Sequence, residues 1–309
     1  KIEFLDFKSL NEILRKISKK KFLIDRATCS IFFENIISKN NKILNFRDPI
    51  YQLKAIKNRK EIENIKLAHK YDGAALTKYI FWLKKNFNRR KITELSGSRK
   101  LYGLRKKNSN FKFLSFPTIS GTGPNGAIIH YNPNKKSDRR LKKGDVYLVD
   151  SGGQYKLGTT DVTRTVSLRN TNQRVKNIYT RVLKGHIAVA NYKLKKKTTG
   201  AIIDKQARKY LNQIGLDYSH GTGHGVGYFL NVHEGPQGIS KNNKVILKEG
   251  MVLSNEPGYY EKNKFGIRIE NLIYVKKKKS KKIFENLTMA PIEKELIDKK
   301  ILNNDEKNW

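Results

Sequence analysis

The spacing of apolar residues along the chain changes between helical periodicity and strand-like alternation. Asn58 can cap a helix, because Glu61 follows it three residues later. Beyond this cap, apolar residues recur at helical spacing, at Ile62, Ile65, Leu76, Tyr79, Ile80 and Leu83. The spacing predicts one long amphipathic helix at the start of the main domain.

Strand-like segments follow this helix. From Phe113 to Leu168 the pattern consists of short alternating runs broken by Gly, Pro and Asn, which is typical of antiparallel strands and turns. A second helix is predicted from apolar residues on one face, at Val175, Ile178, Val182 and Val189. A third helix runs from about Gly200 to Ile214, and strand-like runs return from His220 to Val275. The order of elements is thus helix followed by sheet, repeated twice. This order predicts an α+β fold of two similar halves, with helices covering one sheet.

The start of the chain has a different character. Residues 1 to about 50 alternate short helical and apolar pieces and end in the turn Phe46-Arg47-Asp48-Pro49, where proline disfavours helix in the preceding residue. We therefore place a domain boundary after this turn, with residues 1–53 as the remainder of a preceding domain and residues 54–309 as the main domain. Because Lys1 stands where an initiator methionine would be, we expect a fragment of a longer polypeptide.

Composition narrows the class of protein. A chain of 309 residues can bury one large core or two ordinary ones. The single cysteine, Cys29, excludes an internal disulfide, and no secretory signal is recognisable at the start, so a cytoplasmic location is expected. The longest apolar stretches, such as residues 79–83, fall far short of the roughly twenty residues that a membrane helix needs.

The formal net charge of +38 would attract phosphate backbones, acidic membranes or acidic peptides. The lysines are nevertheless spread over the whole chain, rather than gathered in one stripe with aromatic residues between them. Compositional bias is therefore favoured over a functional polyanion surface, and nucleic acid is not an expected partner. The densest run, Lys276 to Lys279 with Lys281 and Lys282, is predicted to be an exposed turn.

Two aspartates lie at the ends of strand-like segments. Residues 145–149 form a buried-strand run that delivers Asp150 at its end, and Asp161 follows eleven residues later in the alternating segment 159–165. A hairpin between the two segments would set Asp150 and Asp161 side by side. Two carboxylates that close repel each other unless a cation lies between them or they share a proton. The alternative is that both are ordinary turn acids.

Three of the six histidines lie within fourteen positions, at His220, His224 and His233. Glycines at 221, 223, 225 and 227 favour a loop or strand with close backbone approach over a helix. Imidazole suits transition metals, and glycine leaves room for a metal and a substrate. A phosphate-binding loop is the rival reading, but the run lacks the lysine and the following Ser or Thr of a P-loop.

Two glutamates complete the candidate set. Glu256 lies in the segment 254–258, and Glu270 follows a strand in which Ile267 and Ile269 point to one face. Arg268 and Glu270 then point to the other face, so the carboxylate would lie beside a guanidinium. A salt-bridged surface hairpin is the alternative for Arg268 and Glu270.

Together these segments supply four carboxylates and one histidine as candidate metal ligands: Asp150, Asp161, His224, Glu256 and Glu270. Such an oxygen-rich set with one nitrogen suits Mn²⁺, Co²⁺, Fe²⁺ or Zn²⁺, and four negative charges can balance two divalent ions. Two metals about 3.5 to 4 Å apart would hold a bridging hydroxide and polarise a carbonyl. The set predicts hydrolysis of an amide.

These segments resemble the motifs of the metallopeptidase family that comprises aminopeptidase P, prolidase and methionine aminopeptidase, over roughly residues 54 to 300. The matching words are Val149-Asp150-Ser151-Gly152-Gly153, Thr160-Asp161-Val162-Thr163-Arg164-Thr165, Gly221-Thr222-Gly223-His224-Gly225, Asn255-Glu256-Pro257-Gly258 and Ile269-Glu270-Asn271. The sequences of residues 126–131, 221–227 and 232–236 are most similar to those of aminopeptidase P of the three-domain type. Leu157 departs from the pattern, because an acid is expected there.

The resemblance implies a role for each candidate ligand. Asp161 and Glu270 would bridge two metal ions, Asp150 would complete one ion, and His224 with Glu256 would complete the other. Glu256 would also take the proton of the bridging water.

The resemblance also implies that His130, His220 and His233 face the substrate. His130 and His233 would hydrogen-bond the peptide carbonyl as it becomes tetrahedral, and Arg268 would support the site. We expect a strand over Ile128 to Tyr131. The alternative for His130 is a structural role, as a strand histidine whose hydrogen bonds are satisfied within the protein.

The resemblance implies a pita-bread fold for residues 54–309 and the activity of an Xaa-Pro aminopeptidase, with two divalent ions, Mn²⁺ being expected. Its substrates would be peptides with proline at the second position, and the full-length protein would be a homodimer with no membrane partner. Two alternatives stay open: a prolidase, which accepts only dipeptides, and a non-catalytic basic binding module on the same fold.

Overall fold

The computed structural model describes residues 3–309, which divide into two compact units between Leu53 and Lys54. In the first unit, α2 (Ile31–Ser38) connects the parallel strands β1 (Lys21–Ile24) and β2 (Lys42–Asn45). Helix α1 (Leu10–Lys16) precedes them, and α3 (Pro49–Ala55) begins at the proline of the predicted turn. This unit buries Ile24, Ile36 and Ile37 but leaves Phe7, Leu23 and Ile31 exposed.

The second unit repeats helices followed by strands, as the periodicity predicted. Helix α4 (Arg59–Asn86) begins with the expected capping box between Asn58 and Glu61. The first half continues with α5 (Glu94–Arg105) and the strands β3 (Phe111–Leu114), β4 (Ile119–Thr122), β5 (Val146–Ser151), β6 (Gly153–Tyr155), β7 (Gly158–Thr159) and β8 (Val162–Ser167). Helix α5 was not predicted from the apolar spacing.

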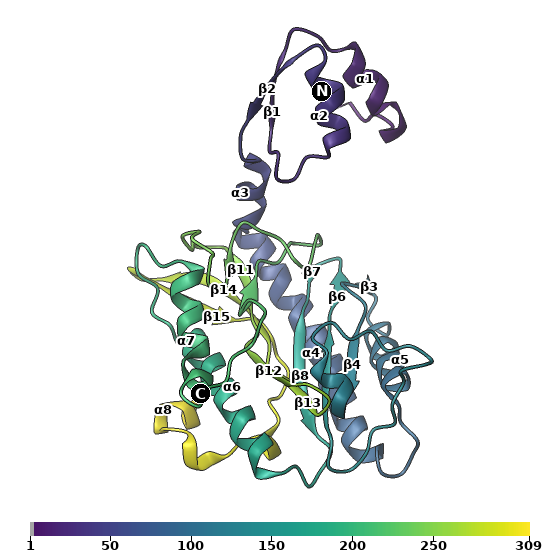
Figure 1. Cartoon of the computed structure of the whole chain (residues 1–309), viewed down its shortest axis with the longest axis vertical. Helices are drawn as coiled ribbons and strands as arrows, with labels where there is room; N and C mark the ends of the chain where they lie inside the picture. The colour runs from purple at the N-terminus through teal and green to yellow at the C-terminus, as the bar shows by residue number, and fades with distance from the viewer. Residues whose placement is uncertain (1–2) are drawn as a thin grey trace. The chain divides into compact units, whose positions relative to one another are not determined.

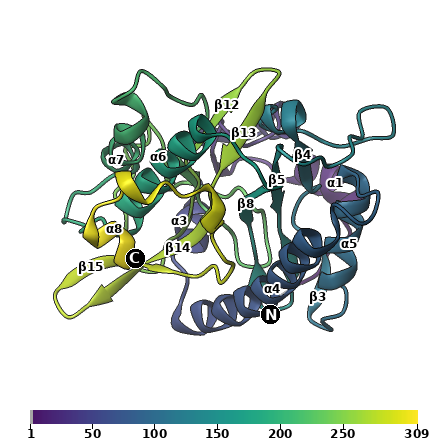
Figure 2. The same ribbon diagram turned by 90° about the horizontal axis from the view of Figure 1, so that it is seen from below.

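The second half begins with α6 (Gln173–Ala190) and α7 (Gly200–Asn212), which pack against each other (Figure 1). Its strands are β9 (Gly223–His224), β10 (Gly238–Ile239), β11 (Val252–Asn255), β12 (Gly258–Glu261), β13 (Phe265–Arg268), β14 (Asn271–Lys278) and β15 (Lys281–Asn286), and α8 (Asn304–Asn308) follows them. Figure 2 shows the helix pair α6 and α7 beside the strands of this half, and α4 beside those of the other. The α+β prediction is confirmed.

The strands form several small antiparallel sheets in this unit, instead of the single sheet that we expected. Strands β4, β5 and β8 form one sheet and β11, β14 and β15 form another. Between β8 and β13 a side chain replaces the usual backbone pairing of neighbouring strands. Thr165 Oγ1 accepts a hydrogen bond from the Arg268 N–H and donates one to the Arg268 carbonyl, each at 3.0 Å. One backbone bond, from Glu270 N to Thr163 O at 3.2 Å, continues this seam. The seam joins the two halves at the place where the candidate acids lie.

Two local predictions were wrong. Residues 128–130 form a turn rather than a strand, because the 3-10 helix Gly123–Ala127 precedes them and the N–H groups of Ile128 and Tyr131 donate back to Asn125 and Ile128. The lysine run is mostly strand, because Lys276 to Lys278 on β14 pair with Lys281 to Ile283 on β15. No helix among residues 3–309 is both long and apolar enough to cross a membrane.

His186 on α6 is fully buried and packs edge-on against Trp309, with the ring centroids 5.6 Å apart. Neither ring nitrogen has a hydrogen-bond partner. Burial, reinforced by the nearby Arg164 guanidinium, lowers the pKa of His186 to about 3. Between about pH 6.5 and 3 the unfolded chain therefore binds a proton that the folded chain excludes, so stability falls as the pH falls through this window.

We predict that His186→Leu weakens this pH dependence. Between pH 7 and pH 4.5 the free energy of unfolding should fall by roughly 2 to 3 kcal/mol less in the variant than in the unmodified protein. Urea unfolding of both proteins at the two pH values measures the difference. Equal losses in the two proteins would contradict the assignment.

Candidate active site

The first half of the unit contributes Asp150 and Asp161. Asp150 lies near the end of β5 and pairs with Thr163 on β8, while Asp161 directly precedes β8. Ligand oxygens of Asp150, Asp161 and Glu270 all lie within 4.8 Å of one another. The structure therefore brings the two aspartates together, as the hairpin predicted, and both are buried.

Close backbone approach places His224. A Cβ on Gly223 would lie 2.0 Å from the carbonyl oxygen of Ser254, so only glycine allows β9 to lie against β11. The His224 N–H donates to Ser254 Oγ at 2.9 Å. His224 Nδ1 lies 3.0 Å from the Gly225 carbonyl, which can only accept, so Nδ1 carries a proton and Nε2 faces the carboxylates.

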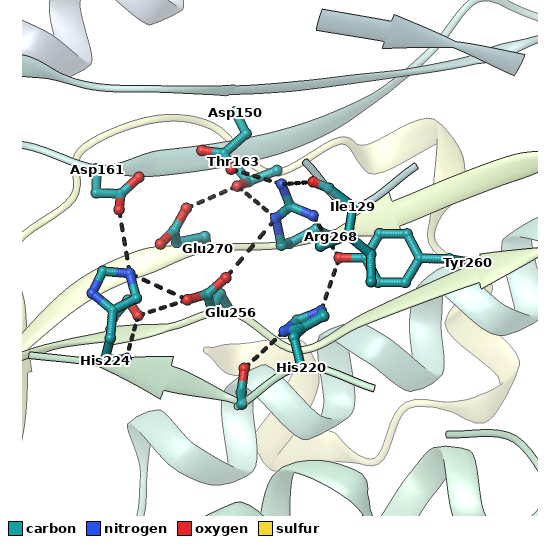
Figure 3. Close-up of polar contacts among 12 residues, drawn as sticks. Ile129, Asp150, Asp161, Thr163, His220, His224, Glu256, Tyr260, Arg268 and Glu270 are labelled. Carbon is teal, nitrogen blue, oxygen red and sulfur yellow. Dashed lines mark hydrogen bonds and ion pairs between the residues drawn. The ribbon is translucent and has the colours of Figure 1, made fainter. Parts of the chain in front are cut away.

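The second half also contributes the two glutamates. Glu256 follows β11, and its Oε1 accepts from Ser254 Oγ at 2.9 Å. Glu270 lies between β13 and β14, where its Oε2 accepts from Thr163 Oγ1 at 2.8 Å. Figure 3 shows both carboxylates facing Asp161 and His224. His224 Nε2 lies 3.3 Å from Glu256 Oε1 and 3.4 Å from Asp161 Oδ2.

Arg268 lies inside the site rather than on the surface. Its side chain is 3% exposed and donates to Asp150 Oδ2 at 2.6 Å. Nε donates to Thr163 Oγ1 at 3.2 Å and lies 4.0 Å from Glu256 Oε2. Since Glu270 is also buried, the surface-hairpin alternative for this pair is wrong.

The carboxylates repel one another in a buried environment. Burial raises the pKa of Asp161 well above its usual range, and the charges of Asp150 and Glu256 add to the effect. Burial and the Asp161 charge do the same to the pKa of Glu270, and burial raises the pKa of Glu256. Among the residues that the structure describes, only Arg268 places a lysine or arginine nitrogen within 4.0 Å of any of these four carboxylates. A bound cation would therefore relieve their repulsion.

The donor atoms fit divalent cations. Three overlapping groups place candidate ligand atoms within 4.8 Å of one another: Asp150 with Asp161 and Glu270, His224 with Glu256 and Glu270, and Asp161 with His224 and His233. The Oδ1 atoms of Asp150 and Asp161 are buried without a hydrogen-bond partner. A buried carboxylate oxygen without a donor is costly, whereas oxygen ligands with one imidazole suit Mn²⁺ and similar ions.

Three further histidines line the cavity of about 460 Å³ that contains the acids. His130 lies on the turn after the 3-10 helix, and His233 faces His224 with their ring centroids 4.0 Å apart. Burial and the neighbouring His224 lower the pKa of His233 to about 4, so it is neutral at neutral pH. His220 differs, because its Nδ1 lies 2.7 Å from Gly221 O and its Nε2 lies 2.9 Å from Tyr260 Oη.

Comparison with known families agrees with this geometry. A model of metallopeptidase family M24 matches residues 63–277, and a model of the C-terminal region of peptidase M24 matches residues 283–309. The chain belongs to metallopeptidase family M24. The expected pita-bread fold is confirmed, because solved M24 structures superpose on most of the chain.

The relatives of this M24 chain include Xaa-Pro aminopeptidases. It is 47% identical to a "Probable Xaa-Pro aminopeptidase P" of Laccaria bicolor, covering 98% of this chain and 49% of that protein. An X-prolyl aminopeptidase of Caenorhabditis elegans, described as a cytosolic enzyme with a di-nuclear active site, matches with a TM-score of 0.84 and 38% identity, covering 89% of this chain and 46% of that one. A prolidase from Pyrococcus furiosus matches with a TM-score of 0.78 and 28% identity, covering 94% and 81%. The chain thus spans about half the length of the curated relatives it matches.

Tyr260 contacts two residues that line the cavity, Arg268 and His220, but the sequence analysis did not find it. Arg268 donates to Tyr260 Oη at 2.5 Å, and that hydroxyl can donate to His220 Nε2 (Figure 3). Burial raises the pKa of Tyr260 to about 12, so the hydroxyl keeps its proton. A hairpin alignment of residues 258–268 could have found it, since strand alternation puts Tyr260 and Arg268 on one face.

Glu94 is the second residue that the sequence analysis missed. Its fully buried carboxylate accepts from Thr122 N at 2.7 Å, Arg139 N at 3.0 Å and Tyr131 Oη at 2.8 Å, and Asn125 Nδ2 donates to both of its oxygens. One side chain thus holds the loop that carries His130. In the sequence, Glu94 has the ordinary position of an acid in the first turn of a helix, which gave no signal of burial.

We predict that Glu94→Gln destabilises the unit by about 1 to 3 kcal/mol, because an amide turns one acceptor oxygen into a donor that faces other donors. Urea unfolding measures the loss. Asp305→Asn is the matched control, since Asp305 is an exposed acid in the first turn of α8; it should change stability by less than about 0.5 kcal/mol. Equal effects of the two substitutions would contradict the role of Glu94.

Proposed function

We propose that this chain is the catalytic portion of a metal-dependent Xaa-Pro aminopeptidase, which hydrolyses the bond between an amino-terminal residue and a following proline. The observation that carries the proposal is the complete set of four carboxylates, three of them buried and Glu256 part-buried, and one histidine in one cavity. Identity of 47% to the Laccaria bicolor relative supports the choice of substrate class. Residues 54–309 would be the catalytic domain, and residues 1–53 the remainder of a preceding domain.

Asp150, Asp161, His224, Glu256 and Glu270 would hold two divalent ions. Asp161, Glu270 and His224 each belong to two of the overlapping ligand groups. Of these, only the two carboxylates have a second oxygen to offer, so Asp161 and Glu270 would be the residues shared by both ions. When bound, two such ions polarise a peptide carbonyl and make water a better nucleophile at neutral pH. Mn²⁺ is the proposed native metal, with Co²⁺, Fe²⁺ and Zn²⁺ as alternatives, because mixed oxygen and nitrogen sites accept several divalent ions.

Glu256 is the proposed general base. Its Oε1 is occupied by the Ser254 hydroxyl, while Oε2 lies 4.0 Å from Arg268 Nε without a close donor. A carboxylate whose pKa is raised by burial accepts a proton from the attacking water more readily. Asp150 would stay oriented through its bond with Arg268.

His130 and His233 would donate hydrogen bonds to the carbonyl oxygen as negative charge develops on it. Both line the cavity beside the acids. A neutral imidazole still offers one N–H donor, so the lowered pKa of His233 does not prevent this role. His220, whose ring nitrogens are engaged by Gly221 and Tyr260, would shape the substrate pocket rather than donate to the substrate.

We also propose a cytoplasmic location and, for the full-length protein, a homodimer. The single cysteine and the cytosolic description of the Caenorhabditis elegans relative support the location. Retention of every candidate ligand argues against a non-catalytic binding module on this fold. Prolidase activity is the second candidate, favoured by the likeness to the Pyrococcus furiosus enzyme.

We predict that metal-stripped protein is inactive and that added Mn²⁺ restores release of arginine from Arg-Pro-Pro. Asp161→Asn should lower kcat/KM by roughly a thousandfold or more, because it removes a charge shared by two ligand groups. The exposed-acid variant Asp305→Asn is the control and should keep full activity. Quantifying free arginine after incubation with each protein gives the rates.

The same assay on Gly-Pro separates the candidates. Cleavage of the dipeptide alone would identify a prolidase. No cleavage of either peptide, despite metal binding measured by calorimetry, would refute a peptidase and leave the binding module.

A further inference from the structure

Glu234 is a buried acid directly beside the substrate-facing His233, and no part of the mechanism above uses it. Its side chain is 2% exposed, and neither carboxylate oxygen has a hydrogen-bond partner. His233 is exposed to the cavity, whereas Glu234 points into the protein. Adjacent residues thus face opposite ways, one toward the site and the other away from it.

Two lysines from the start of the second unit surround this carboxylate. Lys57 Nζ lies 3.7 Å from Glu234 Oε1, and Lys54 Nζ lies 3.4 Å from Oε2. The Lys57 side chain is 1% exposed, so its charge is buried as deeply as that of Glu234. Removal of one member of a buried ion pair is strongly destabilising, because it leaves the other charge uncompensated. The pair therefore resists any movement of Glu234 away from the lysines.

Backbone bonds connect this pair to the site. The Glu234 N–H donates to Gly225 O at 2.8 Å and Gly225 N–H donates to Gln237 O at 3.1 Å, which closes the loop 225–237. A Cβ on Gly227 would lie 2.8 Å from Glu234 Oε2, so the carboxylate lies close under this loop. On the other side, Lys57 N–H donates to Gly250 O at 3.0 Å, just before β11, which leads to Glu256.

We propose that Glu234, held by Lys57 and Lys54, is a positioning residue that fixes the loop 225–237 and thereby orients His233 toward the reacting carbonyl. The proposal rests on the proposed function for the role of His233, but the loop contacts are independent of it. A displacement of about 1 Å at a group that stabilises the transition state can cost on the order of a hundredfold in rate. The loss should therefore appear in kcat more than in KM.

The kinetic test uses the Mn²⁺-loaded protein and Arg-Pro-Pro. Glu234→Gln should lower kcat roughly ten- to hundredfold, with KM changed less than about threefold. In a His233→Ala background the same substitution should change kcat less than about threefold, because the residue through which it acts is absent. Glu249→Gln, an exposed acid that accepts from Lys277 N–H, is the matched control and should leave kcat unchanged.

Hydrogen exchange of the intact chain, followed by mass spectrometry, tests the loop without any catalytic readout. Glu234→Gln and Lys57→Met should each speed amide exchange in residues 225–237 at least about tenfold while β5 and β8 stay protected. The double variant should regain part of this protection, since no buried charge then lacks a partner. If Glu234→Gln does not fold, exchange in residues 225–237 is compared between Lys57→Met and Lys54→Met. Because the Lys54 side chain is 32% exposed, Lys54→Met should speed exchange less than Lys57→Met does.

Unchanged exchange in the loop, or an equal loss of kcat with and without His233, would overturn the positioning role. If the unmodified protein cleaves no proline peptide, the proposed function fails. Exchange in residues 225–237 then decides alone whether Glu234 fixes the loop.

Discussion

Four carboxylates that meet in one largely buried cluster set the main physical constraint on this fold. Asp150, Asp161, Glu256 and Glu270 repel one another, and burial strengthens that repulsion. Each of the four acids lies at or next to a strand end, so the strands hold the carboxylates close together. Hydroxyl donors from Thr163 and Ser254 fix two of the carboxylates further. Compensating positive charge or bound protons would relieve this repulsion, so the arrangement suits a bound cation.

The seam between the two halves carries this arrangement. Thr165 pairs by its side chain with the backbone of Arg268, and Thr163 bonds to both Glu270 and Arg268. Arg164, fully buried between them, donates to the carbonyl of Glu270 at 2.6 Å and to Asn271 Oδ1 at 2.8 Å. On this strand, Thr163 and Thr165 contact Glu270 and Arg268 of the site, whereas the buried Arg164 between them bonds to the adjoining backbone and Asn271. A substitution in the segment 163–165 would therefore disturb both the site and the packing of the two halves.

Support for the site extends beyond the residues that line it. Glu94 gathers the loop of His130 around one carboxylate, and Glu234 anchors the loop of His233 to lysines at the start of the unit. Each acid contacts a loop that carries a cavity-lining histidine, and neither acid lines the cavity itself. Buried polar contacts of this kind fix the position of a loop, because hydrogen bonds and ion pairs are directional whereas apolar packing is not.

The sequence by itself predicted the helices α4, α6 and α7, the α+β class, the capping box at Asn58 and the five candidate ligands. Apolar spacing and residue chemistry are local properties, so they can be read without coordinates. Only the tertiary structure decided that Arg268 is buried beside Asp150, that Tyr260 joins it to His220, and that residues 128–130 form a turn. It also showed that Glu94 and Glu234, ordinary acids in the sequence, are buried. Burial and the pairing of distant segments depend on long-range packing, which no local pattern encodes.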